Sequence, residues 1–331
     1  MHTSHGVKVS RVNRRNCLNG KKKRTQGYGG DGMVWILYHI NKIIKTLFLV
    51  ESIDRYLEKI VVKYYEMFPE KKMGIRNRHA KRKLIVSMTT IPRRIDKVWI
   101  TIESLLRQTY KPDEIILWLS KEEFAHGVIP EKLRQQEKRG LTIRYCDNLK
   151  SYKKFYYTVL ENPDAYIVTV DDDIIYAENL LECMAKTYKK NPGCIVCMRS
   201  HWILRKKERL LPYNDWLAYD QRKEFPKEPS FRNFFTGAGG TFFPMFLMNK
   251  ENLLKRDIFM KIAPAADDVW LNFNAWISGV KIKNCDGVLG SVICIESSSD
   301  QGLYQVNVKK NDEQINRVLD YMGIDIKDYI D

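Results

Sequence analysis

The sequence predicts an α/β fold in which a mostly parallel sheet is flanked by helices and preceded by a basic helical extension. From Lys83 onward, short apolar runs alternate with segments whose apolar residues recur every three or four positions. The first pattern is typical of buried strands, and the second is typical of helices that cover a sheet. Helices placed between successive strands indicate parallel pairing with both faces of the sheet covered.

The elements of this domain are predicted one by one from apolar runs and from helix signals. Asp96 opens a helix, and Gly140 ends a polar one. The strands are predicted at 83–89, 113–120, 141–146 and 165–170, and the helices at 96–108, 130–140, 152–162 and 177–191. We expect the domain to span residues 83–310 and a C-terminal helix to occupy residues 311–331.

The positive charge of the chain lies almost entirely before this domain. The formal net charge is +16, from 56 Lys and Arg against 40 Asp and Glu. Residues 1–83 hold 20 of the basic and 6 of the acidic residues, which leaves 36 against 34 in residues 84–331. Because nucleic-acid binding depends on neutralising phosphates, a nearly neutral domain argues against such a partner. A nucleic-acid binder that uses only the basic arm is kept as a third hypothesis.

The first 82 residues are predicted to form a basic extension in two parts. Residues 1–32, with "KKKR" at 21–24, hold nothing that builds a core and are predicted to be a disordered tail. Residues 33–82 are predicted to be an amphipathic helical extension. A membrane-spanning helix is disfavoured there, because Lys42 and Lys45 would each cost about 2.5–3.5 kcal/mol at the bilayer centre. Two alternatives stay open, namely helices that lie on a membrane and a helical hairpin packed on the protein's own surface.

The cysteines favour a reducing compartment. Seven cysteines show no regular spacing, which is not the pattern of a disulfide framework. Cys194 and Cys197 form a CxxC in an apolar run, where we interpret them as small buried hydrophobes. We expect a cytoplasmic protein, with peripheral attachment of the basic extension to the inner face of the plasma membrane as a hypothesis.

Three consecutive aspartates end the fourth predicted strand, in "VTVDDDIIY" at 168–176. Ligands gather at the carboxyl ends of strands in parallel sheets. Alternate aspartates at such a point can coordinate a hard divalent cation, which in turn bridges the phosphates of a nucleotide diphosphate. The alternative is a solvated acidic turn that caps the next helix.

The order of several motifs resembles that of GT-A-fold nucleotide-sugar glycosyltransferases, most closely the bacterial polysaccharide-type, family 2-like enzymes. The likeness covers roughly residues 83–310. It is carried by the aspartates, which match the family's DXD motif, and by "TTIPRR" at 89–94, "SYKK" at 151–154, "GAGGTFFP" at 237–244 and "P-x-x-DD-x-W" at 264–270. "DDDI" and "ADDVWLNF" are also similar to the exostosin-type N-acetylhexosaminyltransferases.

The resemblance implies a donor site near the first strand and the metal motif. It implies that Asp171 and Asp173 hold the ribose and the metal, Mn²⁺ or Mg²⁺, with Asp173 the preferred metal ligand, and that Lys154 approaches the diphosphate. An ordinary solvated helix face is the alternative for the two neighbouring lysines. The implied donor-binding residues are Thr89, Thr90, Arg94, Asp147, Lys153, Lys154, Asp171 and Asp172.

The second half of the domain is expected to bind the acceptor. In the resembled family an acidic residue at the place of Asp268 or Asp267 faces the acceptor hydroxyl, which implies a general base, with Asp268 preferred. A helix start also favours acidic residues without any catalytic reason. Glycines allow close approach of the backbone to a ligand, although a tight turn without a ligand is the alternative. The acceptor-binding candidates are Arg199, His201, Trp202, Gly239, Gly240 and Trp270.

The main hypothesis is therefore a metal-dependent glycosyltransferase of the hexosyl- or N-acetylhexosaminyltransferase kind. It would move a sugar from a nucleotide-diphosphate donor to a glycan or lipid-linked acceptor in surface polysaccharide synthesis. The alternative is a catalytically inactive glycan-binding protein on the same fold. The sequence leaves open the sugar, the base of the donor, the acceptor, the oligomeric state and the choice between retention and inversion.

Overall fold

The computed structural model describes residues 32–48, 53–76, 81–125, 127–218, 228–285, 292–295 and 303–330. Apart from Gly32, the predicted disordered tail lies outside the described residues.

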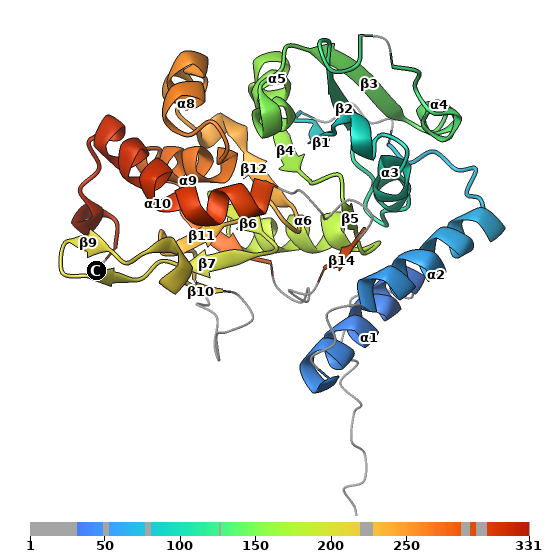
Figure 1. Ribbon diagram of the computed structural model, residues 1–331, viewed down its shortest axis with the longest axis horizontal. Coiled ribbons are helices and arrows are strands. Elements are labelled where there is room, and N and C mark those ends of the chain that lie inside the picture. Colours follow the sequence, from blue (N-terminus) through green and yellow to red (C-terminus); the bar gives the residue numbers. More distant parts are fainter. Residues whose placement is uncertain are drawn as a thin grey trace, which may run out of the picture.

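A seven-stranded sheet forms the centre of the molecule (Figure 1), in the order β13-β6-β12-β4-β1-β2-β3. All neighbours pair in parallel except β12, which runs antiparallel to both of its neighbours. This arrangement confirms the predicted α/β class with a mostly parallel sheet. The strands are β1 Leu84–Thr89, β2 Glu114–Ser120, β3 Leu141–Cys146, β4 Tyr166–Thr169, β6 Ile195–Cys197, β12 Thr241–Pro244 and β13 Ile282–Asn284.

Successive side chains of β1 enter different cores, because neighbouring residues of a strand point to opposite faces of the sheet. Leu84, Val86 and Met88 belong to one hydrophobic cluster, and Ile85 belongs to the other. The first cluster is completed by α3 (Val98–Leu106), α4 (Glu131–Glu137) and α6 (Leu180–Lys190). The second is completed by α5 (Lys153–Glu161), α8 (Arg256–Ile262), α9 (Asp267–Ile277) and α10 (Leu303–Met322).

The second half of the domain adds short elements beside the main sheet. A small sheet has the order β10-β7-β11, and β8 pairs with β9 as a hairpin. The C-terminal helix α10 begins at Leu303, earlier than the expected residue 311. The short strands of the domain are β5 Ile174–Ile175, β7 Ser200–Trp202, β8 Arg205–Lys206, β9 Arg209–Leu210, β10 Leu217–Ala218, β11 Asn233–Phe235 and β14 Ile293–Cys294. A short helix, α7, spans Lys250–Leu253, and 3₁₀ turns lie at Pro92–Arg94, Lys150–Tyr152, Tyr213–Asp215, Met245–Leu247 and Ile326–Asp328.

The N-terminal extension contributes two helices, α1 (Met33–Phe48) and α2 (Ile53–Met67). One face of α2, with Leu57, Val61 and Tyr65, is buried in the same cluster as α3 and α6. The inner face of α2 therefore agrees with the second of the two alternatives, a helical pair packed on the protein's own surface. Within the described ranges, no helix is both long and apolar enough to cross a membrane.

Candidate active site

The three aspartates lie where β4 ends, next to the end of β1. These strands pair in parallel, with Ser87 opposite Thr169. Parallel pairing places the residues after both strands at the same edge of the sheet. The turn after β1 therefore meets the aspartates, and two residues of that turn, Thr90 and Arg94, contact them directly.

Asp172 is held inside the protein by three hydrogen bonds. Its side-chain oxygens accept hydrogen bonds from Thr90 Oγ1 at 2.5 Å and from Arg94 Nη1 at 2.6 Å. Its backbone carbonyl accepts a third from Thr101 Oγ1 at 3.0 Å. The carboxylate is thus buried and bonded through both oxygens, and the role of Asp172 in donor binding stays a prediction. Its contacts fix the turn that presents its two neighbours.

Asp173 has a less compensated charge. Arg94 Nη1 lies 3.1 Å from its carboxylate, but the same guanidinium is shared with Asp172. Partial desolvation, and then the negative charges of Asp171 and Asp172, raise the pKa of Asp173 to about 6. The half-buried carboxylate is thus one that an additional cation would stabilise.

Lys154 joins the aspartates to the second half of the domain. Its Nζ lies 2.8 Å from Asp171 Oδ1 and 3.3 Å from Asp267 Oδ2. Burial alone would lower the pKa of this lysine, but the two carboxylates more than offset that effect and raise it, so Lys154 is charged. The alternative of a solvated helix face is excluded for both lysines, because Lys153 and Lys154 are buried. Lys153 points to a different partner, Glu123, at 3.1 Å.

Asp267 and Asp268 begin α9, and their surroundings differ. Asp267 is paired with Lys154, whereas Asp268 accepts a hydrogen bond from the backbone N–H of Val269. Desolvation and then the negative charge of Asp267 raise the pKa of Asp268 to about 7. A carboxylate with such a pKa is suited to take up a proton near neutral pH.

The glycine segment after β11 approaches the charged cluster at Gly237. A Cβ on Gly237 would lie 3.4 Å from both Asp171 Oδ2 and Lys154 Nζ, so this glycine lies directly beside the charged pair. Sequence reasoning missed Gly237 and chose its neighbours. Gly240 has a φ of +96°, and its added Cβ would face the core side chains of Met184 and Val170.

The acceptor candidates fall into two groups. A Cβ on Gly239 would lie 3.5 Å from Arg199 Cγ, so these two residues are neighbours beside the glycine segment. His201 and Trp202 are half-buried on β7. Trp270, in contrast, is fully buried, and its Nε1 donates to the carbonyl of Leu253. We therefore correct its assignment, since Trp270 belongs to the core and presents no surface to a ligand.

Two further donor candidates lie near the strand ends. Thr89 Oγ1 donates to the carbonyl of Trp118 at 2.8 Å and so ties β1 to β2. Asp147, directly after β3, is half-exposed and lies 3.2 Å from Arg256 Nη1. The roles expected for them in nucleoside binding stay predictions.

The residues present fit a divalent cation that is shared with a ligand. Among the described residues, no group of three or more His, Cys, Asp or Glu side chains is arranged to hold a metal on its own. Asp171 and Asp173 supply the hard oxygen ligands that Mg²⁺ and Mn²⁺ prefer. A cation held by one or two carboxylates normally takes its remaining ligands from water and from substrate phosphates. The site therefore suits a phosphate-bearing ligand better than a closed structural metal site.

Comparisons with known proteins find similarity to solved structures only. No protein-family model matches the sequence, and no curated protein matches it. The fold is similar to the mannosyltransferase PcManGT from Pyrobaculum calidifontis in complex with GDP-Man and Mn²⁺, with a TM-score of 0.47 and 14% identity over 87% of this chain and 76% of that one. It is similar to S. aureus TarS 1-349 in complex with UDP, with a TM-score of 0.45 and 14% identity over 62% of this chain and 58% of that one. For 4-diphosphocytidyl-2C-methyl-D-erythritol synthase the TM-score is 0.37 and the identity 12%, over 63% and 91% of the chains. At these values the likenesses do not bear on the reaction of this chain.

Proposed function

We propose that this protein is a metal-dependent glycosyltransferase that moves a sugar from a nucleotide-diphosphate donor to a glycan or lipid-linked acceptor, in surface polysaccharide synthesis. One observation carries the proposal. Lys154 contacts Asp171 at the end of β4 and Asp267 at the start of α9, so the expected donor side and the expected acceptor side form one charged site.

On the donor side, the proposal assigns two tasks to charged groups. Asp171 and Asp173 hold Mn²⁺ or Mg²⁺, which when bound offsets the negative charge of the diphosphate. Lys154 carries a fixed positive charge in a buried position. Negative charge grows on the diphosphate as it departs, and a preorganised cation stabilises that charge most where water is excluded. Thr89, Arg94 and Asp147 are proposed to contact the nucleoside.

On the acceptor side, Asp268 is proposed as the general base. Its carboxylate takes the proton from the acceptor hydroxyl as the oxygen forms a bond to the anomeric carbon. The bond between that carbon and the phosphate oxygen breaks, and both of its electrons leave with the nucleotide diphosphate. Arg199, His201, Trp202 and Gly239 are proposed to contact the acceptor. Asp267 keeps Lys154 in place through their ion pair.

A catalytically inactive glycan-binding protein is the second candidate. The observation that favours it is that Asp171 and Asp173 already have cationic partners in Lys154 and Arg94. An inactive protein would bind glycans but turn over no nucleotide sugar.

A donor screen with Mn²⁺ separates the two candidates. We expect release of free nucleotide diphosphate from one class of nucleotide sugar, and we expect Asp173→Ala to abolish it while the thermal unfolding transition is retained. Asp164→Ala is a matched control, because that aspartate is exposed at the surface. No turnover of any donor by the unmodified chain would favour the inactive protein, and full activity of Asp173→Ala would remove the metal assignment.

For the whole protein we propose a cytoplasmic location, with peripheral contact with an anionic membrane. The net charge of the first 83 residues supports this, since each Lys or Arg near an anionic leaflet contributes about 1 kcal/mol.

A further inference from the structure

The outward side of α2 carries an unusual combination of side chains. We define the α2 outer face by Tyr56, Lys59, Ile60, Lys63 and Met67, which recur at spacings of three and four and therefore lie on one side of the helix. Tyr56 is 66% exposed, Ile60 49% and Met67 57%. Both lysines are exposed as well, and this face has no acidic residue.

The opposite side of α2 is buried inside the protein. Leu57 and Val61 are buried together with Tyr65. The apolar residues of the outer face are thus not needed for packing α2 onto the domain. Exposed apolar residues in a row, with lysines between them, are typical of helices that lie in a bilayer interface.

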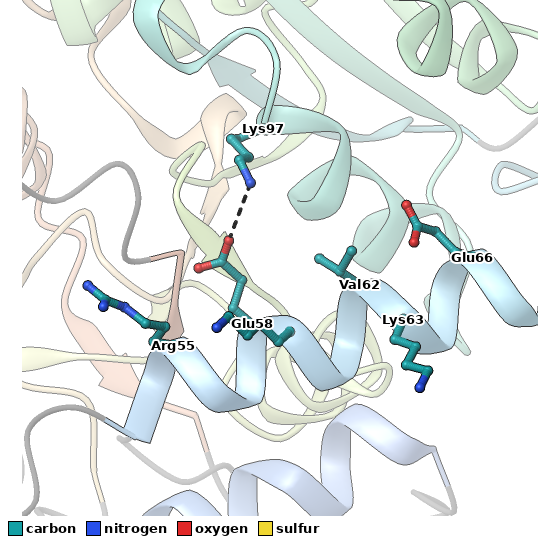
Figure 2. A pocket seen from close by; sticks show the side chains of 7 residues that line it. Arg55, Glu58, Val62, Lys63, Glu66 and Lys97 are labelled. Carbon is teal, nitrogen blue, oxygen red and sulfur yellow. Dashed lines mark ion pairs between the residues drawn. The ribbon is translucent and has the colours of Figure 1, made fainter.

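A basic hollow of about 580 Å³ runs along one flank of this face, between α2 and the start of α3. In Figure 2, Glu58 points toward Lys97 on the body of the protein, and Lys63 points away from it. Glu58 lies 3.9 Å from Lys97, and Glu66 lies 2.9 Å from Lys132. The hollow is lined by the cations Arg55, Lys59, Lys63 and Lys97 and by those two paired acids.

We propose that the α2 outer face docks on an anionic phospholipid bilayer, with Tyr56, Ile60 and Met67 in the interface and lipid phosphates in the basic hollow. Charge complementarity selects this occupant, because the face and the chain before it are both basic. Residues 1–31 hold eight Lys and Arg against one Asp. A second copy of this chain would bring the same positive charges into contact and is therefore disfavoured.

The contacts of the two N-terminal helices would hold the active site at a fixed orientation to that surface. The backbone N–H groups of Val34 and Trp35, at the start of α1, both bond to the Glu178 carboxylate at 3.0 Å. The α2 helix packs on β14 (Ile293–Cys294), which pairs with β5 (Ile174–Ile175) directly after the aspartates. Figure 1 shows the helical pair beneath these strands, far from α8 and α10.

Vesicle flotation of the full chain tests the proposal without nucleotide or acceptor, so the result does not depend on sugar transfer. The probes are phosphatidylcholine vesicles with and without phosphatidylglycerol, at low and high salt. We expect binding only to the anionic vesicles, weakened by salt. The triple variant Lys59→Glu, Ile60→Asp and Lys63→Glu should bind at least about twentyfold more weakly, because each lysine near an anionic surface contributes about fivefold.

The matched control is Val128→Asp, Lys138→Glu and Lys261→Glu, which changes one exposed apolar residue and two exposed lysines outside α2. Circular dichroism and thermal unfolding confirm that both variants are folded, and light scattering gives their oligomeric state. Loss of binding in the α2 variant alone supports the proposal. Equal binding by the two variants overturns it, and so does a dimer of the unmodified chain that becomes a monomer only in the α2 variant.

Discussion

Two acidic clusters meet at Lys154, one at the end of β4 and one at the start of α9. In each cluster, one carboxylate is held by a cation and the carboxylate next to it has a raised pKa. In the first, Asp172 is fixed by Thr90 and Arg94, and the pKa of its neighbour Asp173 is raised. In the second, Asp267 is fixed by Lys154, and the pKa of its neighbour Asp268 is raised. Adjacent carboxylates therefore differ in how fully a cation compensates their charge: Arg94 lies 2.6 Å from Asp172 but 3.1 Å from Asp173, and Lys154 pairs with Asp267.

Removal of the proposed base should give the largest effect on the second cluster. Asp268→Asn keeps the shape of the side chain but cannot accept the proton. We expect kcat for transfer to fall by about 10²–10⁴-fold. Steady-state kinetics with a saturating donor measure this, and donor binding should change little. A variant that keeps more than a tenth of the activity would show that another group takes the proton.

Replacement of the shared lysine should weaken both clusters. Lys154→Met leaves Asp171 and Asp267 without their common cation, and we expect kcat to fall by about 10²–10³-fold. Lys153→Met is the matched comparison, because Lys153 is also buried on α5 but pairs with Glu123 instead. Equal losses in the two variants would mean that general damage to α5, and not the charge in the site, explains the result.

In the first cluster, Asp172 should contribute to the stability of the fold, whereas Asp173 should not. Asp172→Asn removes the charge of a buried partner of Arg94, and we expect a loss of about 3 kcal/mol in the free energy of unfolding. Asp173→Asn removes a carboxylate that its neighbours repel, so the folded protein should be unchanged or more stable by about 1 kcal/mol. Urea denaturation measures both variants. Similar losses in the two would contradict the division of tasks.

The pH dependence of transfer should distinguish Asp268, the proposed base, from Asp267, which pairs with Lys154. Since the base must be deprotonated and the pKa of Asp268 is raised to about 7, kcat/KM should fall as the pH drops through 7. Below that point we expect about a tenfold loss for each pH unit. A profile of kcat/KM with Asp267→Asn should shift its midpoint downward, because the second cause of the raised pKa is removed. A profile that is flat from pH 5 to 8 would contradict this role.

The parts of the fold that were predictable from the sequence depend on local patterns. The third strand was predicted at 141–146 and is observed as Leu141–Cys146, because its apolar run is bounded by Gly140 and a polar turn. The helix predicted from residue 177 begins only at Leu180. There Ala177 is buried and Gln108 donates to its carbonyl, a contact from another element that the sequence does not reveal.

The site was predictable as a set of segments but not as a set of roles. The triplet, Lys154 and the acidic pair do come together, whereas Lys153 pairs with Glu123. Their individual tasks depend on contacts between distant segments, such as the bonds from Thr90 and Arg94 that bury Asp172. For the same reason Trp270 was wrong as a ligand contact, since its place in the core is set by packing against α7 and α8.

The most direct test is an electron paramagnetic resonance titration of Mn²⁺ with the full chain in the presence of a nucleotide diphosphate. We expect the signal of free Mn²⁺ to fall with the unmodified chain, and we expect this loss to be abolished when Asp171 and Asp173 are both replaced by alanine in a folded protein. An equal loss of signal with that double variant would contradict it.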